Sequence, residues 1–147
     1  MIRIREITEN EQNLFDDLQG LIGQLTERPA SRERLAEMIA DPHVILLVAE
    51  AEGRRIGILT LALYDTLTAR RGWVEDVVVD AAFRGCGAGR ALVEAAVRRS
   101  AELGIDTLSL TSAPRRTAAR TLYRSEGFRE AETTLFRLWT ENSNVKI

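Results

Sequence analysis

The chain has 147 residues, of which 45% are hydrophobic and 29% are charged, a balance typical of one folded domain rather than of a disordered chain. Its net charge of -2 at pH 7 gives it no general attraction for nucleic acid. A single cysteine, Cys86, excludes an internal disulfide, and with a single histidine, His43, it is too little for a structural zinc site. No segment approaches the roughly 18 apolar residues of a membrane span, and the charged start lacks a signal-peptide core. We therefore expect one cytoplasmic domain over residues 1–147 that binds no metal and no membrane.

Hydrophobic periodicity predicts an order of secondary-structure elements. Ile2 and Ile4 alternate with arginines, as in a short strand. Residues 9–26 carry apolar residues three and four positions apart, and Ser31 is a typical N-cap for a second amphipathic helix. The remaining expected elements, in chain order, are a β-hairpin over 44–64, a polar loop at 65–72, a strand at 73–80, a helix at 88–103, a strand at 107–111, a helix at 116–126 that ends at Gly127, and a last strand at 135–140.

This order predicts the fold class. The strand-helix-strand unit over 73–111 should be parallel and right-handed, whereas the hairpin is antiparallel. Strands and helices alternate along most of the chain, so helices should cover both faces of the sheet. The expected fold is α/β, with three layers in the order α/β/α and a mixed central sheet.

The segment that follows the valine-rich strand carries a ligand-binding pattern. Gly85, Gly87 and Gly89 lie where a strand ends and a helix begins. Glycine lets the backbone approach a ligand closely, and a helix N-terminus offers free N–H groups with a partial positive charge. This combination predicts an anion site that suits a pyrophosphate. A P-loop is excluded because no lysine is near, and a Rossmann fingerprint is excluded because Arg90 stands where its third glycine should be.

The pattern R-x-x-G-x-G at Arg84, Gly87 and Gly89 resembles the acetyl-CoA loop of the GNAT superfamily of N-acetyltransferases. A second segment, residues 116–128, resembles the R-x-x-A-x-x-x-Y-x-x-x-G-F helix of the same family, in which many members have Asn where Arg116 stands. The expected order of elements is similar to that family over nearly the whole chain. The first 70 or so residues resemble the family in pattern alone, and the family's substrate choice usually lies there.

The resemblance implies a GNAT-like fold and direct transfer of an acetyl group from acetyl-CoA to a primary amine in a ternary complex. The strand backbone would hold the pantetheine in a wedge between two splayed strands, with the Val77 N–H as oxyanion donor. The backbone N–H groups of the loop would hold the pyrophosphate of coenzyme A. The implied cofactor-binding residues are Val77, Val78, Val79, Arg84, Gly85, Cys86, Gly87, Ala88, Gly89 and Arg90.

Two side chains are candidates for proton transfer. Tyr123 is the candidate general acid, because a phenol can protonate a thiolate leaving group; its alternative is a core tyrosine. Glu75 is the candidate base, acting through water, because it shares strand parity with Val77 and Val79. The alternatives are a carboxylate that only supports the loop, or a water chain without a dedicated base. Trp73 has the same parity and would line the acceptor pocket or fill the core.

Other functions remain open at this point. The main alternative is a non-catalytic acyl-CoA-sensing module with the same fold. An acyl-enzyme at Cys86 is disfavoured because this residue lies where the phosphates should be, and His43 is expected to be a plain edge residue. The acceptor is a small-molecule or peptide amine that residues 20–35 and 64–72 should select. Dimers are common in the resembled family, although no residue of this chain predicts one.

Overall fold

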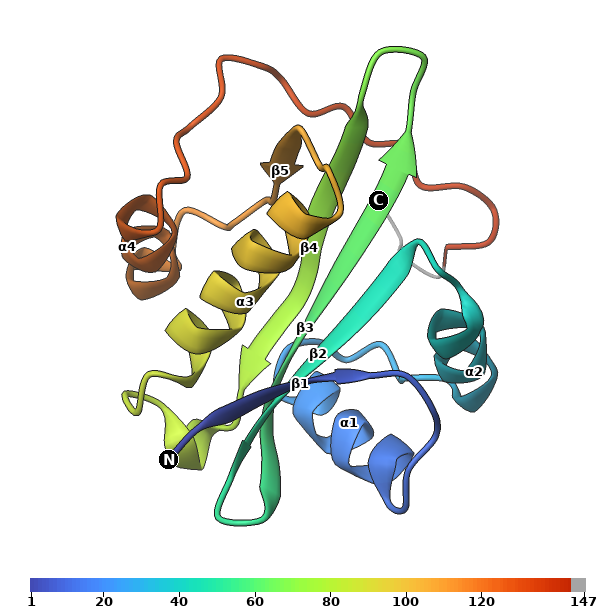
Figure 1. Ribbon diagram of the computed structural model, residues 1–147, viewed down its shortest axis with the longest axis vertical. Helices are drawn as coiled ribbons and strands as arrows, with labels where there is room; N and C mark the ends of the chain where they lie inside the picture. Colours follow the sequence, from blue (N-terminus) through green and yellow to red (C-terminus); the bar gives the residue numbers. More distant parts are fainter. Residues whose placement is uncertain (144–147) are drawn as a thin grey trace.

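The computed structural model describes residues 1–143 and has one mixed sheet of five strands with helices on both faces. The sheet order is β1-β2-β3-β4-β5, and only the β4–β5 pair is parallel. This arrangement confirms the expected fold class, including the parallel strand-helix-strand unit (Figure 1). No helix among residues 1–143 is long and apolar enough to cross a membrane. The elements are β1 (Arg3–Ile7), α1 (Leu14–Gly23), α2 (Arg32–Ala40), β2 (Val44–Ala51), β3 (Arg54–Asp65), β4 (Arg70–Val79), a short 3-10 helix η1 (Ala81–Phe83), α3 (Ala88–Glu102), β5 (Thr107–Ser109) and α4 (Thr117–Ser125).

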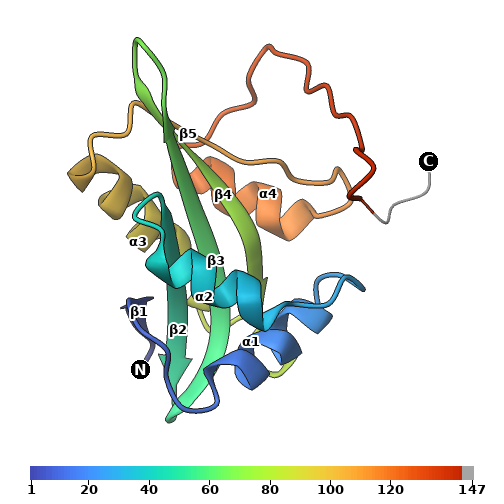
Figure 2. The same cartoon turned by 90° about the vertical axis from the view of Figure 1, so that its right-hand side faces the viewer.

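Each face of the sheet has its own hydrophobic core. Leu59 and Leu61 of β3 pack with Leu92 of α3 on one face. Ile58 of β3 packs with Leu18 of α1 on the other. α4 adds partly buried side chains to the α3 side, and Figures 1 and 2 show α1 and α2 on the opposite side of the sheet. Alternating strand residues therefore serve two cores, as a three-layer fold requires.

The first helix and the β3–β4 connection differ from the sequence-based expectations. α1 begins at Leu14 because Asn13 at its N-cap adopts a left-handed conformation with a φ of 61°, which ends the helical repeat there. β4 begins at Arg70, so only residues 66–69 connect it to β3, where a longer polar loop is expected from the sequence. Ser31 does cap α2, since its side chain accepts a hydrogen bond of 3.2 Å from the Arg34 N–H.

The predicted last strand at 135–140 was wrong. In the described part of the chain these residues pair with no strand, and Phe136 is 89% exposed. The segment is rich in residues that favour strands, but such a propensity reports a fit to a pleated surface and needs a neighbouring strand to be realised. The segment instead crosses the end of the molecule that carries the β3–β4 turn (Figure 1).

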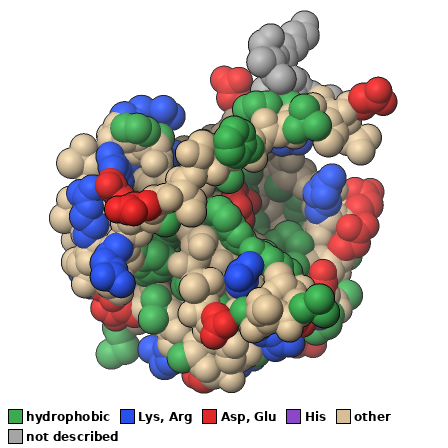
Figure 3. All heavy atoms as spheres, turned by 90° about the horizontal axis from the view of Figure 1, so that it is seen from above, with side chains coloured by type: hydrophobic (Ala, Val, Ile, Leu, Met, Phe, Trp, Pro, Cys, Tyr) green, Lys and Arg blue, Asp and Glu red, His purple; other side chains and the backbone are tan. Residues whose placement is uncertain are grey.

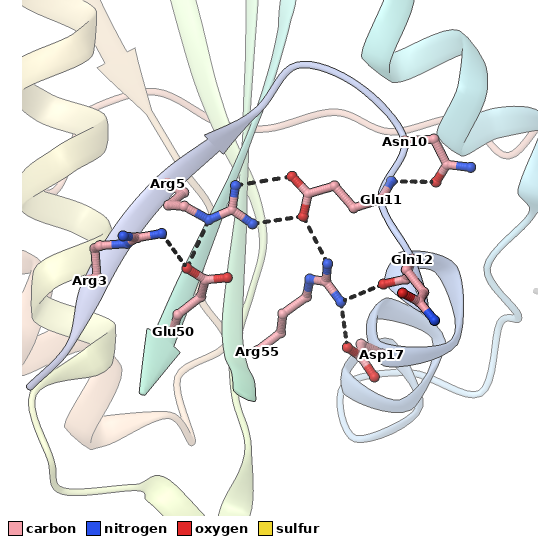
Figure 4. A network of polar contacts seen from close by, with 8 residues as sticks. All are labelled: Arg3, Arg5, Asn10, Glu11, Gln12, Asp17, Glu50 and Arg55. Atoms are coloured by element: carbon pink, nitrogen blue, oxygen red, sulfur yellow. Dashed lines mark hydrogen bonds and ion pairs between the residues drawn. The ribbon is translucent and has the colours of Figure 1, made fainter. Parts of the chain in front are cut away.

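A network of charged side chains fastens the start of α1 to the sheet (Figure 4). Glu11, just before α1, accepts hydrogen bonds from Arg5 of β1 at 2.7 Å and from Arg55 of β3 at 2.8 Å. Arg55 also donates to Asp17 of α1 at 2.7 Å, and Arg5 donates to Glu50 of β2 at 2.8 Å. The hydrogen bonds from the two arginines lower the pKa of Glu11 to about 2. The helix that covers this face is thus held by charge as well as by its apolar side.

Candidate functional site

A bulge in the middle of β4 shapes the candidate site. Ile58 of β3 stands opposite Val78, but Thr60, two residues on, stands opposite Glu75, so β4 contains one extra residue in this stretch. Asp76 lies inside the bulge with a φ of +52°, in the left-handed region. Among residues other than glycine, aspartate is one of those that tolerate this conformation best.

The bulge reverses the parity of the strand, so the predicted common face of Glu75, Val77 and Val79 was wrong. Val74 packs in the core on the α3 side, and beyond the bulge Val77 and Val79 pack against that same core. Glu75 stands opposite Thr60, whose neighbours in β3 point to the α3 side, so it lies on the α1–α2 face.

Trp73 shares the α1–α2 face with Glu75. It stands opposite Ala62 of β3, two positions along from Thr60, and its side chain is partly exposed. The structure therefore separates the candidate base and Trp73 from Val77 and Val79, whereas Val78 packs in the core on the α1–α2 face.

The pairing of β4 with β5 ends close to the bulge. They pair only from Arg71 opposite Thr107 to Trp73 opposite Ser109. β4 then continues to Val79, so its last six residues, 74–79, have no strand neighbour on this side among residues 1–143. Backbone groups of a strand need a hydrogen-bonding partner, and a ligand lying along this open edge can supply one.

The turn after β4 adopts a left-handed backbone conformation at two of its glycines. Gly85 and Gly87 have φ values of +83° and +92°, and Gly87 is the N-cap of α3. An added Cβ at either position would meet no other atom of residues 1–143 within 4 Å, so the space around the turn is open. The side chain of Gln24, the C-cap of α1, accepts a hydrogen bond of 2.9 Å from the Ala81 N–H and so ties the end of α1 to the segment before the turn.

Charged and reactive side chains around the turn are exposed. Arg84 makes no ion pair within residues 1–143, whereas Arg90 is hydrogen-bonded to Glu126 at the end of α4. Cys86 is exposed with a free thiol. One free and one paired arginine thus flank the N-terminus of α3.

Tyr123 is positioned by the way α4 ends. The Phe128 N–H donates to the Tyr123 carbonyl at 3.0 Å, and the Gly127 N–H donates to the Arg124 carbonyl at 3.1 Å. This is a Schellman motif with Gly127, at a φ of +98°, in its left-handed position. The rings of Tyr123 and Phe128 meet edge to face at 5.9 Å between centroids. The spacing Y-x-x-x-G-F is therefore the spacing of this cap, and Gly127 ends the helix as predicted.

Three elements converge beside Tyr123. A Cβ added at Gly89 would lie 3.6 Å from Leu122 of α4 and 3.8 Å from Val79 of β4. Tyr123 itself packs, partly buried, against the same core as Val77 and Val79. The structure thus brings the candidate acid, the end of β4 and the start of α3 to one side of the sheet.

The titratable groups of the site have shifted pKa values. Burial raises the pKa of Tyr123, and the charge of Arg116 partly opposes this. Burial also raises the pKa of Glu75, as does the neighbouring charge of Asp76, while Arg137 acts in the opposite direction. The pKa of Asp76 is raised by burial. Solvent still reaches both carboxylates, which lie at the rim of the site rather than beneath its surface.

Sequence reasoning missed two residues of this region. Asp76 forms the bulge, and the signal was an aspartate within a strand rich in valine, because aspartate is depleted in strands. Arg137 acts electrostatically on Glu75 and lies 5.9 Å from the centroid of the Trp139 ring. No local signal marks Arg137, since its place depends on the path of the chain after α4.

Besides the open glycine turn, the described residues form a hollow at the end of the molecule that carries the β3–β4 turn and two cavities beside α1. Viewed from the end that carries the β3–β4 turn, the molecule is hollowed, with hydrophobic side chains inside and charged side chains of both signs around (Figure 3). Two cavities of about 360 and 420 Å³ lie against α1, and neither is lined by the glycine turn or Tyr123. No cluster of three or more potential metal ligands occurs among residues 1–143.

Comparison with known proteins gives a family and a fold. The sequence profile of the Acetyltransferase (GNAT) family matches residues 11–128. No curated protein matches the chain. An acetyltransferase from Trypanosoma brucei is 27% identical, with a TM-score of 0.79 over 95% of this chain and 100% of the other.

Two further structures share the fold at lower identity. An aminoglycoside acetyltransferase from an uncultured soil metagenomic sample is 20% identical, with a TM-score of 0.82 over 95% of each chain. The enzyme AAC(6')-Iy, solved with the bisubstrate analogue CoA-S-monomethyl-acetylneamine, is 22% identical, with a TM-score of 0.78 over 95% of this chain and 99% of the other.

Proposed function

Because the chain belongs to the GNAT acetyltransferase family, we propose that it is an N-acetyltransferase that uses acetyl-CoA and acts as a single domain over residues 1–147. The observation that carries this proposal is the open edge of β4 beside the glycine turn. Within residues 1–143, residues 74–79 have no strand neighbour on the β5 side, and Gly85 and Gly87 place a left-handed backbone in open space at the start of α3. An extended thiol-bearing chain suits the first feature, and its pyrophosphate suits the second.

Acetyl-CoA, when bound, would supply the thioester carbonyl that an amine attacks, and coenzyme A would leave as the thiol. Backbone groups of Val77, Val78 and Val79 would bind the pantetheine, with the Val77 N–H donating to the carbonyl oxygen as charge develops there. The backbone from Gly85 through Gly89, including Cys86 and Ala88, would bind the pyrophosphate. Arg84, which makes no ion pair within residues 1–143, would add positive charge, and Arg90 would first have to leave Glu126.

The corrected orientation of Glu75 suits its role as a base. An amine must lose a proton on the acceptor side, whereas a leaving thiolate must gain one on the cofactor side. Glu75 lies on the α1–α2 face and Tyr123 packs on the α3 side with Val77. As the C–N bond forms and the C–S bond breaks, Glu75 would take the amine proton through water and Tyr123 would donate to sulfur. The raised pKa of Glu75 suits a base near neutral pH.

The acceptor in this proposal is a small-molecule or peptide amine. Similar structures include aminoglycoside acetyltransferases and a glucosamine-6-phosphate N-acetyltransferase from Arabidopsis thaliana, which favours a small molecule. A cytoplasmic location stays a prediction. A non-catalytic acyl-CoA-sensing module is the second reading, and Tyr123 with Glu75 favours the enzyme.

The test combines coenzyme A binding with release of free thiol over a panel of amines. We expect Tyr123→Phe to lower kcat by roughly 10²–10⁴-fold with little change in the Kd for coenzyme A, because the variant loses only the transferred proton. Thr121→Val is the control, since it also removes a hydroxyl from α4 but at an exposed position outside the proposed acceptor-selecting segments. Failure to bind coenzyme A at millimolar concentration would refute the proposal. Binding without thiol release for any amine would favour the sensing module.

A further inference from the structure

An ion pair joins the two helices beside the proposed cofactor site. Arg90, in the first turn of α3, donates a hydrogen bond to the carboxylate of Glu126, which is the C-cap of α4. The Arg90 side chain is 50% exposed, whereas that of Glu126 is 15% exposed. The helices also approach each other here, since a Cβ added at Gly89 would lie 3.6 Å from Leu122 of α4. The positive charge of Arg90 is thus already paired within the chain.

Each partner of this pair carries the charge that its own helix end disfavours. The N-terminus of a helix has a partial positive charge, and the C-terminus has a partial negative one. Arg90 is a cation near the positive end of α3, and Glu126 is an anion at the negative end of α4. Residues 88–91, the first turn of α3, include no acidic side chain. Glu126 therefore brings a carboxylate to a helix start whose own sequence lacks one.

We propose that Glu126 competes with the phosphate groups of coenzyme A for Arg90 and so lowers the affinity of the cofactor site. This inference rests on the proposed function. A guanidinium donates to phosphate and to carboxylate with the same planar fork of N–H groups, so a phosphate that binds Arg90 displaces Glu126. In the free protein Glu126 holds Arg90, and in the complex the phosphate holds it.

The competition acts on acetyl-CoA and on the product coenzyme A alike, because both carry the same phosphates. An interaction that is equal for substrate and product changes how tightly both bind without changing the chemical step. Glu126 is largely buried, and taking Arg90 from a buried carboxylate costs more than taking it from an exposed one. When coenzyme A leaves, Glu126 regains Arg90, so the ion pair favours release of the product.

A purely structural role of the Glu126 side chain would act in the opposite direction. The Glu126 N–H donates to the carbonyls of Leu122 and Tyr123 at 3.1 Å each, so this residue belongs to the cap that positions Tyr123. If its carboxylate only held α4 against α3, loss of the charge would loosen the site and weaken cofactor binding. Competition predicts that the same loss strengthens binding, so the sign of the change separates the two roles.

The experiment is calorimetric titration of the full chain with coenzyme A. Glu126→Gln keeps the shape of the side chain and removes its charge. We expect it to lower the Kd roughly 2- to 10-fold, because an ion pair of modest strength no longer has to be broken. Glu130→Gln is the matched control, since it removes the same charge just after α4, where Glu130 accepts hydrogen bonds from Arg120 and Arg124. This control should leave the Kd unchanged.

A double-mutant cycle shows whether the gain in affinity passes through Arg90. In the Arg90→Gln background, Glu126→Gln should no longer lower the Kd, because no guanidinium remains to be released. An unchanged or raised Kd in Glu126→Gln overturns the inference and leaves the proposed function in place. The same follows if Glu126→Gln loses its fold, or if its gain recurs in Glu130→Gln or persists in the Arg90→Gln background. A wild-type chain that does not bind coenzyme A at millimolar concentration overturns the proposed function and this inference together.

Discussion

The two glycines that flank Ala88 should respond in opposite directions to the same substitution. Gly87 has a φ of +92° at the N-cap of α3, whereas Gly89 lies within the first turn of the helix. A Cβ at Gly87 meets no atom of residues 1–143 within 4 Å, so only the backbone conformation opposes alanine there. A Cβ at Gly89 meets Leu122 at 3.6 Å and Val79 at 3.8 Å, which are ordinary contacts.

The magnitudes follow from these geometries. A left-handed backbone costs a residue with a side chain roughly 1–2 kcal/mol, so Gly87→Ala should lower the free energy of unfolding by about that amount. Alanine is better than glycine inside a helix by about 0.5–1 kcal/mol, so Gly89→Ala should raise it. For a chain of this length 1 kcal/mol shifts the Tm by about 3 °C, so the two variants should differ by roughly 5–9 °C.

The assay is urea unfolding of both variants beside the wild type, followed by titration with coenzyme A. Gly87→Ala should also weaken coenzyme A binding, because the direction of the N–H groups at the turn depends on the left-handed backbone. Two destabilised variants, or two stabilised ones, would refute the conformational argument. Unchanged coenzyme A affinity in Gly87→Ala would remove the turn from the binding site while leaving its backbone geometry intact.

The remaining predictions concern two carboxylates. Glu75→Gln should flatten the acidic limb of the pH dependence of kcat/KM. The control Glu37→Gln, on the exposed face of α2, should leave this limb unchanged. An unchanged acidic limb in Glu75→Gln would exclude Glu75 as the base. Because the folded-state pKa of Glu75 is raised, its ionised form costs stability above the unfolded pKa, so Glu75→Gln should raise the Tm at pH 7. The pKa of Glu11 is lowered from 4.5 to about 2, so its contribution is present above pH 4.5 and is lost as the pH falls to about 2. Discounted for partial exposure, this contribution is about 1–3 kcal/mol, and Glu11→Gln should lose it in urea unfolding at pH 7 but converge with the wild type near pH 2. An equal difference at both pH values would contradict the linkage.

The sequence predicted those parts of the fold that local chemistry determines. Ser31 caps α2 and Gly127 ends α4, because each position depends on side-chain or backbone properties of a few neighbouring residues. The positive φ at Gly85 and Gly87 follows from the same kind of rule. The two motifs that resembled the GNAT family lie in these regions, and the family match over residues 11–128 covers both.

The errors concern features that depend on distant partners. Whether residues 135–140 form a strand depends on a free edge within reach, which periodicity does not contain. The parity of Glu75 relative to Val77 depends on the register between β3 and β4, and one extra residue at Asp76 reverses it. Register is a property of the pair of strands, so a prediction made from one strand alone assumes an uninterrupted ladder.

The bulge at Asp76 and the separation of β4 from β5 lie close together in the sheet, and both shape the candidate site. A β4 without the bulge would put the side chains of Glu75, Val77 and Val79 on one face. The proposed base would then lie on the same face as the side chains next to the proposed cofactor site. The extra residue turns Val77 toward the α3 side while leaving Glu75 toward α1 and α2. Pairing with β5 stops at Trp73, three residues before Asp76, so the strand changes face where its edge is already free. Under the proposed mechanism, straightening the bulge, for example by deleting Asp76, should abolish thiol release from acetyl-CoA even in a variant that still folds, because Glu75 would then lie on the same face of the strand as Val77.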